Sequence, residues 1–426
     1  MDLNIPNIDL PRVVIIGSGF AGLKFARTIN GKLFQTVLID KENYHTFQPL
    51  MYQVTSSGLE ANSIVYPIRK ALKGKKNFHF RMTEVLDVNS KSKEITTKNG
   101  TLKFDYLIIA TGAGSNFFGM DNIRKHGYTM KNIVESLKLR NVILQNFETA
   151  LNTSDRTKRK ELMRFVIVGG GATGIELAGA LADLKNNILQ RDYQDLSINK
   201  MQIYVIEASE RLLPAMSKNA SINAEKFLTE IGVIVLLNTT VKDYDGTTVI
   251  TNKKEIKSNT LIWSAGVQGN PIGNLDNSLN RANRIITDEF NQVKGYEDIY
   301  SIGDVSCIET EKDGRGHPML GSIAAQQGKQ LAKNFNASAK NKERKPFKYK
   351  DMGTMATIGR HKAVVDLPFV KFSGILAWYV WMFLHLMLLV GARNMLVVFI
   401  DWTWRYFKYD NSLRLIIGKG KHKKDN

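Results

Sequence analysis

The sequence predicts an α/β protein with two copies of one βαβ unit and an apolar helical segment near its C-terminal end. A β-branched run ending in a glycine-rich turn occurs at residues 12–22 and again at residues 165–174. Each copy continues into a helix-compatible stretch and a second apolar strand. Residues 340–350 are basic and polar, and residues 372–407 are mostly apolar and aromatic. These three observations predict two Rossmann-like domains followed by a distinct helical region.

The first copy is a strand at residues 12–16, a glycine turn, a helix to about Asn30 and a strand at residues 36–40. In a G-x-G-x-x-G turn the glycines permit a tight bend, close approach of a pyrophosphate and close packing of helix on strand. Asp40 ends the second strand, where a carboxylate accepts hydrogen bonds from ribose hydroxyls. The predicted dinucleotide contacts are Gly17, Ser18, Gly19, Phe20, Ala21, Gly22 and Asp40.

The second copy has Gly169, Gly171 and Gly174 after the strand at residues 165–168. Its acid, Glu207, lies 38 residues after Gly169, farther than the usual spacing of about 20. We expect a longer helix and the polar stretch at residues 186–200 to absorb the difference. A carboxylate at this place favours NADH, because it repels the 2′-phosphate of NADPH. Arg211 is compatible with a 2′-phosphate, so NADPH remains an alternative nucleotide for this site.

Both halves close with a similar pattern of an apolar strand, a small residue and a glycine. The first ends at Thr111 and Gly112 and the second at Ala265 and Gly266, which we expect to contact the respective dinucleotides. A later strand ends at Asp304, and ligand crevices form at the carboxyl edge of such strands. Asp304 is therefore a further candidate for the first nucleotide site.

Net charge and cysteine content limit the classes of partner and chemistry. The formal charge of +19 attracts anions, and the basic cluster at residues 419–424 follows an apolar, Trp-rich stretch. This order favours an anionic lipid surface over nucleic acid. The single cysteine, Cys307, excludes a disulfide within the chain, a cysteine zinc site and paired-thiol redox chemistry, and we expect no metal. The N-terminus has no secretory pattern, which predicts a cytoplasmic protein.

Several segments of the sequence resemble the type II NADH dehydrogenases, a family of two-dinucleotide-binding-domain flavoproteins. The resemblance covers essentially the whole chain and is most specific at residues 43–53, 169–179, 263–267 and 353–360 and in the Trp-rich C-terminal region. It implies a flavin domain at residues 1–121 and 287–345, with an NADH domain inserted at residues 122–286. Residues 346–426 would form the membrane-associated region.

The resemblance also implies ligands and site residues. FAD would be held without a covalent bond, with Lys41, Val85 and Ala324 added to the first site. Glu176 would lie beside the nicotinamide and flavin rings as the catalytic residue, and either Glu176 or His385 would supply protons to a quinone. Ser322 stands where the glutamine helix of the family has its first glutamine, so that part of the resemblance is weakest. The expected quinone contacts are Gln48, Gln326, Gln327, Trp381 and His385.

Residues 373–392 are long enough to span a bilayer. The stretch is, however, rich in Trp and Tyr, which prefer the membrane interface, and Arg393 interrupts it. Two helices lying in the interface fit these residues better than one span. We therefore expect peripheral or monotopic attachment to the cytoplasmic face of the cell membrane. A soluble helix pair, including one that forms a homodimer, is the alternative.

The sequence thus predicts oxidation of NADH and two-electron reduction of a membrane quinone, ubiquinone or menaquinone, without proton pumping. Proton pumping is not expected because no set of membrane-spanning helices with buried ionisable groups is present in the pattern. Two alternatives remain. One is a soluble NADH-dependent reductase of a protein electron carrier, and the other is a sensor that binds FAD or NADH without catalysis.

Overall fold

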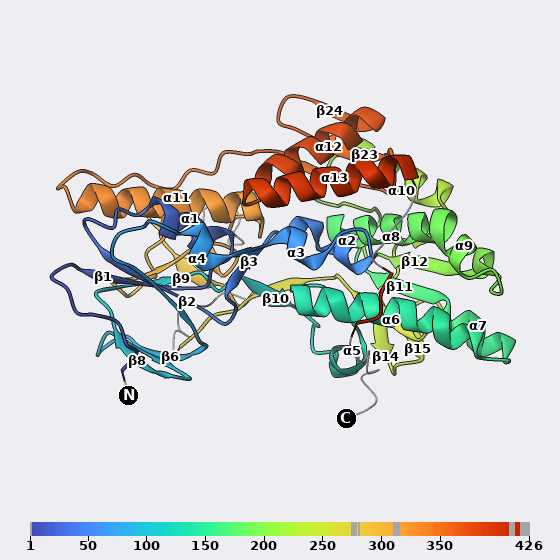
Figure 1. The fold of residues 1–426 in the computed structure, drawn as a ribbon, viewed down its shortest axis with the longest axis horizontal. Coiled ribbons are helices and arrows are strands. Elements are labelled where there is room, and N and C mark those ends of the chain that lie inside the picture. Colours follow the sequence, from blue (N-terminus) through green and yellow to red (C-terminus); the bar gives the residue numbers. More distant parts are fainter. Residues whose placement is uncertain (1, 274–278, 280–281, 310–315, 409–413, 418–426) are drawn as a thin grey trace. The chain divides into compact units, whose positions relative to one another are not determined.

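The computed structural model describes residues 2–273, 279, 282–309, 316–408 and 414–417 (Figure 1). The chain divides into two compact units. The basic cluster at residues 419–424 lies outside the described residues. The first unit comprises Met1–Thr46, Tyr66–Gly114 and Val267–Asp351, and the second comprises Phe47–Val65, Ser115–Gly266 and Met352–Asn426.

The first unit is centred on a parallel five-stranded sheet of order β20-β9-β1-β2-β5. Successive residues of a strand point to opposite faces, and both faces of this sheet are covered. Val13 and Ile15 pack in a core with α1 and α11, whereas Val14 and Ile16 pack in a second core with residues of β6, β7 and β8. Burial on both sides explains the continuous apolar runs that the sequence shows.

The helices and strands of the first unit have the following bounds: β1 (Arg12–Ile16), α1 (Phe20–Thr28), β2 (Gln35–Asp40), β3 (Tyr44–Thr46), α4 (Ile68–Ala71), β5 (Phe78–Met82), β6 (Val85–Asn89), β7 (Glu94–Thr97), β8 (Gly100–Lys103), β9 (Tyr106–Ile109), β18 (Val267–Gly269), β19 (Ile285–Thr287), β20 (Ile299–Ser301), β21 (Ser306–Ile308) and α11 (Gly321–Ser338). Two short strands cross the chain divisions, β4 (Val65–Pro67) and β10 (Ala113–Ser115).

The second unit has a parallel sheet of order β13-β12-β11-β17. Between β11 and β12 the chain forms α8, a π-helical turn (η2), a short helix (α9) and a 3₁₀ turn (η3). These elements account for the long spacing between Gly169 and Glu207. With the first sheet, they confirm the prediction of an α/β fold with two dinucleotide-binding domains.

The helices and strands of the second unit have the following bounds: η1 (Gln48–Leu50), α2 (Met51–Thr55), α3 (Ala61–Ile64), α5 (Asp121–His126), α6 (Ile133–Leu151), α7 (Arg156–Leu162), β11 (Arg164–Val168), α8 (Ala172–Leu184), η2 (Lys185–Leu189), α9 (Gln190–Asp192), η3 (Ile198–Lys200), β12 (Gln202–Ile206), α10 (Lys218–Glu230), β13 (Val233–Leu236), β14 (Val241–Tyr244), β15 (Thr248–Thr251), β16 (Glu255–Lys257), β17 (Thr260–Trp263), β22 (Thr354–Thr357), β23 (Ala363–Asp366), β24 (Lys371–Gly374), α12 (Ile375–Leu388) and α13 (Ala392–Lys408).

The C-terminal part of the second unit is an antiparallel sheet, β22-β23-β24, followed by α12 and α13. The two helices lie side by side (Figure 1). A turn with Gly391 at φ +93° separates them, so the apolar run at residues 373–392 does not form one continuous helix. Among the described residues, no helix has both the length and the apolar character needed to cross a membrane.

Candidate functional site

The glycine turn of the first unit has the geometry that its sequence predicts. Gly17 has φ +102°, and a Cβ there would lie 2.4 Å from the carbonyl oxygen of Ala110. A Cβ at Gly22 would lie 1.9 Å from the carbonyl oxygen of Gly17. A Cβ at Gly19, in contrast, meets no atom of the residues that the structure describes within 4 Å, which leaves this glycine accessible for close approach of a ligand. The first and third glycines serve chain packing, and the second leaves the space that a pyrophosphate needs.

Asp40 is fixed beside this turn by Ser18. The backbone N–H and the hydroxyl of Ser18 both donate to Asp40 Oδ2, at 2.6 Å each. Nearby, Lys41 forms an ion pair with Glu84 at 2.5 Å, and Val85 begins β6 with its side chain in the core. Asp40 thus lies at the carboxyl end of β2, where a dinucleotide fold presents its acid to a ribose.

The end of β20 meets the first turns of α1 and α11. Gly303 has φ +79°, and a Cβ there would lie 3.0 Å from the Cβ of Ala21 and 3.6 Å from that of Ala324. Asp304 follows Gly303 and Ala324 lies in the first turn of α11, so the structure brings both predicted residues to the glycine turn. Thr111 donates to the carbonyl oxygen of Asn270 at 2.5 Å.

The second unit repeats this arrangement with different residues. A Cβ at Gly174 would lie 2.0 Å from the carbonyl oxygen of Gly169, whereas one at Gly171 meets nothing within 4 Å. The N–H of Gly170 donates to Glu207 Oε2 at 2.6 Å, and Ser209 donates to Oε1 through its N–H and its hydroxyl at 2.8 Å each. Glu207 therefore occupies the place that Asp40 has in the first unit, despite its longer spacing in sequence.

Two glycines and one arginine define the surroundings of this second turn. Gly169, at φ +110°, lies against the backbone of Ser264 and Ala265, and Gly266 also has a positive φ of +72°. Arg211 donates to the carbonyl oxygens of Pro214 and Met216, at 2.8 and 3.2 Å. Its guanidinium is thus engaged by the following loop.

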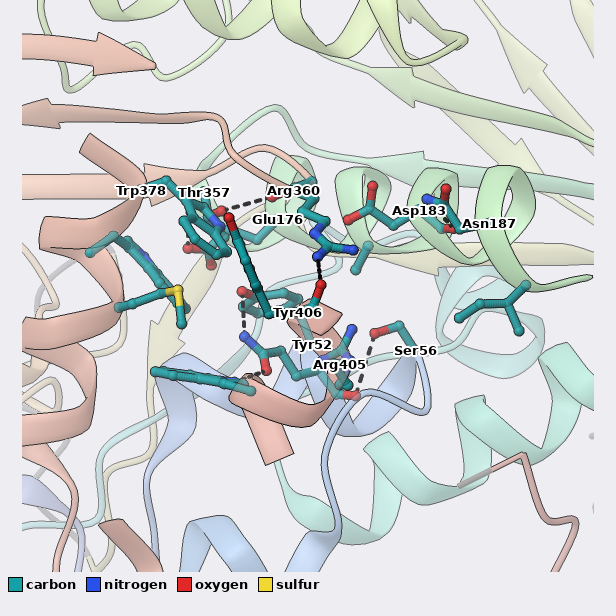
Figure 2. A pocket seen from close by; sticks show the side chains of 17 residues that line it. Tyr52, Ser56, Glu176, Asp183, Asn187, Thr357, Arg360, Trp378, Arg405 and Tyr406 are labelled. Carbon is teal, nitrogen blue, oxygen red and sulfur yellow. Dashed lines mark hydrogen bonds between the residues drawn. The ribbon is translucent and has the colours of Figure 1, made fainter. Parts of the chain in front are cut away.

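A pocket in the second unit encloses about 820 Å³, including space open to solvent (Figure 2). We call it the inner pocket. One wall is α8, another is the end of β22 with the turn that follows it, and α2, α12 and α13 complete it. The polar and charged side chains around it are Tyr52, Gln53, Ser56, Glu176, Asp183, Asn187, Thr357, Arg360 and Arg405.

Glu176 lies in the wall of the inner pocket with 8% of its surface exposed. The N–H of Thr357 donates to Glu176 Oε1 across 3.4 Å, a long hydrogen bond (Figure 2). Burial raises the pKa of Glu176 to about 8, against smaller opposing effects of Thr357 and Trp381. The carboxyl group is therefore largely protonated at neutral pH and can donate a proton there.

Trp381 and His385 stack on one another on α12. Their ring centroids lie 4.0 Å apart at an interplanar angle of 22°, and His385 Nδ1 lies 2.8 Å from the carbonyl oxygen of Trp381. Burial lowers the pKa of His385 to about 4, so the imidazole is neutral at pH 7. Among the described residues, the buried indole Nε1 of Trp381 has no hydrogen bond of ordinary geometry, but its N–H lies close enough to the Glu176 carboxyl group to lower the pKa of that group.

A second cavity, of about 770 Å³ including space open to solvent, lies between α12 and α13. We call it the helix groove. Its walls are almost wholly apolar and include Phe383, Leu386 and Phe399. Trp378, Met382, Trp402 and Tyr406 line both the helix groove and the inner pocket. A ligand with a polar head and an apolar tail fits such a pair of adjoining cavities.

The structure separates the predicted quinone contacts into two groups. Trp381 lines the inner pocket, and His385 stacks on it, whereas Gln48 of the same unit is exposed. Gln326 and Gln327 belong to the first unit. Gln327 is buried and accepts from the N–H of Gly303 at 2.7 Å. Gln326 is held to the backbone of Lys350 by two hydrogen bonds of 3.0 Å.

Several residues of the inner pocket were not singled out from the sequence. Gln53 is one, and its side-chain oxygen accepts from Trp402 Nε1 at 2.8 Å. Asp183, Arg360 and Arg405 are others. The sequence could have identified Asp183 as a pocket residue, because it follows Glu176 by seven residues on a predicted helix and so lies on the same face of that helix. No sequence pattern could have identified Trp402 and Arg405, since no local pattern indicates which elements α13 packs against.

Comparison with known proteins identifies the family. The family model described as pyridine nucleotide-disulphide oxidoreductase matches residues 11–328, and that of the NDH2 C-terminal domain matches residues 352–408. The solved structure of NDH2 from Plasmodium falciparum in complex with NADH has a TM-score of 0.88 at 24% identity, and the match covers 96% of this chain and 100% of that one. That structure has the same fold.

Two curated relatives extend the match. The type II NADH:quinone oxidoreductase of Staphylococcus aureus is 28% identical over 369 residues, which cover 84% of this chain and 89% of that protein. The type II NADH:quinone oxidoreductase Ndh of Mycobacterium tuberculosis is 33% identical over 414 residues, which cover 92% of this chain and 87% of that protein. With its two nucleotide folds and its C-terminal domain, the chain belongs to the type II NADH:quinone oxidoreductase family.

Proposed function

We propose that the chain transfers two electrons from NADH to a membrane quinone through non-covalently bound FAD. The observation that carries this proposal is the buried carboxyl group of Glu176 in a pocket that continues into an apolar groove between two C-terminal helices. Membership of the type II NADH:quinone oxidoreductase family supports both substrates. The single cysteine supports direct transfer to the acceptor, because a thiol route needs a cysteine pair.

The first unit fits FAD. Open space at Gly19 and a fixed carboxylate at Asp40 suit its pyrophosphate and ribose. When bound, FAD supplies a redox centre that accepts a hydride and passes on two electrons. We assign FAD to one group of residues: Gly17, Ser18, Gly19, Phe20, Ala21, Gly22, Asp40, Lys41, Val85, Thr111, Gly112, Asp304 and Ala324.

The second unit fits NADH in preference to NADPH. The Glu207 carboxylate already lies against the glycine turn and would repel a 2′-phosphate, and the Arg211 guanidinium is bonded to its own loop. We assign NADH to Gly169, Gly171, Gly174, Glu207, Ala265 and Gly266.

The inner pocket fits the head of a quinone, and the helix groove fits its tail. Glu176 is the proton donor of this proposal because its carboxyl group is protonated at neutral pH, whereas the neutral His385 has no readily lost proton there. The indole N–H of Trp381 lies buried in the pocket wall beside the Glu176 carboxyl group and is suited to a quinone oxygen that Glu176 protonates. His385 fixes that indole by stacking.

An exposed apolar face supports attachment to the cytoplasmic surface of the cell membrane. Leu376, Tyr379 and Phe383 lie along one side of α12, at spacings of three and four residues, and these three and the neighbouring Ile375 are exposed. α13 adds further exposed apolar residues. Together with the net charge of +19, this face suits an anionic lipid surface that contains the quinone.

Mixing experiments on the purified protein test the proposal. We expect a yellow protein that bleaches on addition of NADH and recovers its colour with a ubiquinone or menaquinone analogue, but not with a ferredoxin. Failure to bleach would leave only the non-catalytic sensor. Recovery with ferredoxin alone would favour the soluble reductase.

A further inference from the structure

One face of α8 forms a continuous wall of the inner pocket. Glu176, Ala180, Asp183 and Asn187 all line it, at intervals of three and four residues that continue into η2. Glu176 and Asp183 come from the same helix (Figure 2) and are separated by two turns, about 10 Å along the axis. Two carboxyl groups therefore share one cavity at a distance that a few water molecules can bridge.

The surroundings of Asp183 come from several elements. It accepts a hydrogen bond from the backbone N–H of Arg360 in the turn between β22 and β23. The charges of Arg360, of Lys362 at that turn and of Arg405 on α13 favour its ionised form. Tyr52 on α2 faces both Asp183 and Glu176, and its own pKa is raised by burial. Lys362 also pairs with Glu230.

Exposure differs between the two carboxyl groups. Glu176 is buried, whereas Asp183 keeps partial access to solvent. Burial raises the pKa of Asp183 to about 6, and that of Glu176 to about 8. Glu176 therefore holds a proton more tightly than Asp183 does. Transfer of a proton from Asp183 to the Glu176 carboxylate is favourable for that reason.

We propose that Asp183 passes protons from solvent to Glu176 through water in the inner pocket. This inference rests on the proposed function. NADH supplies a hydride, which carries two electrons and one proton, so the formation of one quinol takes one further proton. That proton leaves the O–H of Glu176 and bonds to a quinone oxygen. Asp183 then donates a proton to the Glu176 carboxylate and regains one from solvent.

A purely structural role of Asp183 can be separated from this relay. Asparagine keeps an oxygen that accepts from the Arg360 N–H but has no titratable proton, so Asp183→Asn preserves the turn and removes the relay. Asp183→Ser is a second variant without a carboxyl group, and Asp183→Glu restores one. Asp401→Asn is the matched control, because Asp401 is a half-buried carboxylate near Arg405 that does not line the inner pocket.

The test uses the FAD-loaded protein in stopped flow, with flavin reduction by NADH and reoxidation by a soluble quinone analogue measured separately across pH. In Asp183→Asn we expect normal reduction but reoxidation at least about tenfold slower, as for loss of a proton-transfer group. Added formate should restore part of the rate, and Asp183→Glu most of it. Reoxidation by ferricyanide takes up no proton and should be unchanged in every variant.

The outcomes separate the relay from the proposed function. Quinone reoxidation at the wild-type rate in both Asp183→Asn and Asp183→Ser would overturn the relay, as would an equal loss in Asp401→Asn. A loss that extends to ferricyanide and resists formate would assign Asp183 a structural role instead. A wild-type protein that reduces ferricyanide but no quinone would refute the proposed function itself.

Discussion

Three carboxylates in this chain differ in what their surroundings do to them. Asp40 and Glu207 accept short hydrogen bonds from serine and backbone donors beside the glycine turns. Glu176 accepts a long hydrogen bond of 3.4 Å from the N–H of Thr357 and lies beside the indole N–H of Trp381, in a buried position. These surroundings support the proposed roles, with Asp40 and Glu207 as acceptors for ribose hydroxyls and Glu176 as an acid.

The raised pKa of Glu176 makes a prediction for stability. Its folded pKa of about 8 exceeds the ordinary value of 4.5, so the native state binds the proton more tightly than the unfolded state between these values. The free energy of unfolding of the wild type should therefore fall as pH rises from 5 to 8, relative to Glu176→Gln, by up to about 1.4 kcal/mol per pH unit. Denaturant unfolding of the FAD-loaded proteins in detergent measures this. A constant difference across that range would contradict the assignment.

Glu207 makes a prediction for nucleotide choice. Glu207→Gln keeps an acceptor for the Gly170 N–H but removes the negative charge. We expect KM for NADH to rise, and the preference for NADH over NADPH, as the ratio of kcat/KM values, to fall by about tenfold or more, equal to about 1.4 kcal/mol. Steady-state rates with both nucleotides test this. Glu210→Gln, at a neighbouring acid without this contact, is the control.

At the scale of elements, α8 serves two sites in the second unit. Its N-terminal end forms the glycine turn, and its length carries Glu176 and Asp183 along the inner pocket. It packs on the turn after β22 through Gly179, where a Cβ would lie 2.3 Å from the backbone nitrogen of Gly359. This close packing sets the distance between the walls of the pocket.

Two glycine substitutions, one within α8 and one at its N-cap, should have different effects. Gly179→Ala forces α8 away from Gly359, and we expect it to destabilise the fold by about 1–3 kcal/mol, as overpacking does, and to slow quinone reduction. In Gly171→Ala the added Cβ meets no atom of the described residues within 4 Å, so this variant should keep nearly the same stability while its KM for NADH rises. Thermal unfolding and half-reaction rates compare the two. Equal stability of both variants would show that the contact at Gly359 relaxes easily.

For the whole molecule, local sequence patterns predicted the fold far better than they predicted the residues of the inner pocket. The strands β1 and β11 and their glycine turns follow from β-branched runs and steric rules that act within a few residues. The inner pocket joins Gln53, Thr357, Trp381 and Arg405, which lie on four different elements, α2, β22, α12 and α13. Only tertiary packing brings these together, and none of them has a local signal for its partner. Of the pocket residues that were missed, Asp183 could have been found from helical periodicity, because it lies two turns after Glu176.

The exposed apolar face gives the last prediction, for membrane attachment. Phe369, Leu376 and Ile400 are 100%, 64% and 53% exposed, and none lines the inner pocket or the helix groove. Their combined replacement by serine should weaken binding to anionic phosphatidylglycerol vesicles by more than about tenfold, because each buried apolar side chain contributes about 1.5–3 kcal/mol. Vesicle co-sedimentation measures this, with ferricyanide reduction as the check on folding.

Val134 and Ile222 supply the matched control. They are 62% and 63% exposed and lie on α6 and α10 of the same unit. Replacement of both by serine removes exposed apolar side chains from helices that the proposed attachment does not use, so vesicle binding should stay at the wild-type level. If the control variant lost as much binding as the triple variant, general surface hydrophobicity would account for attachment. If neither variant lost binding, α12, α13 and the turn at Phe369 would not be the face that meets the lipid.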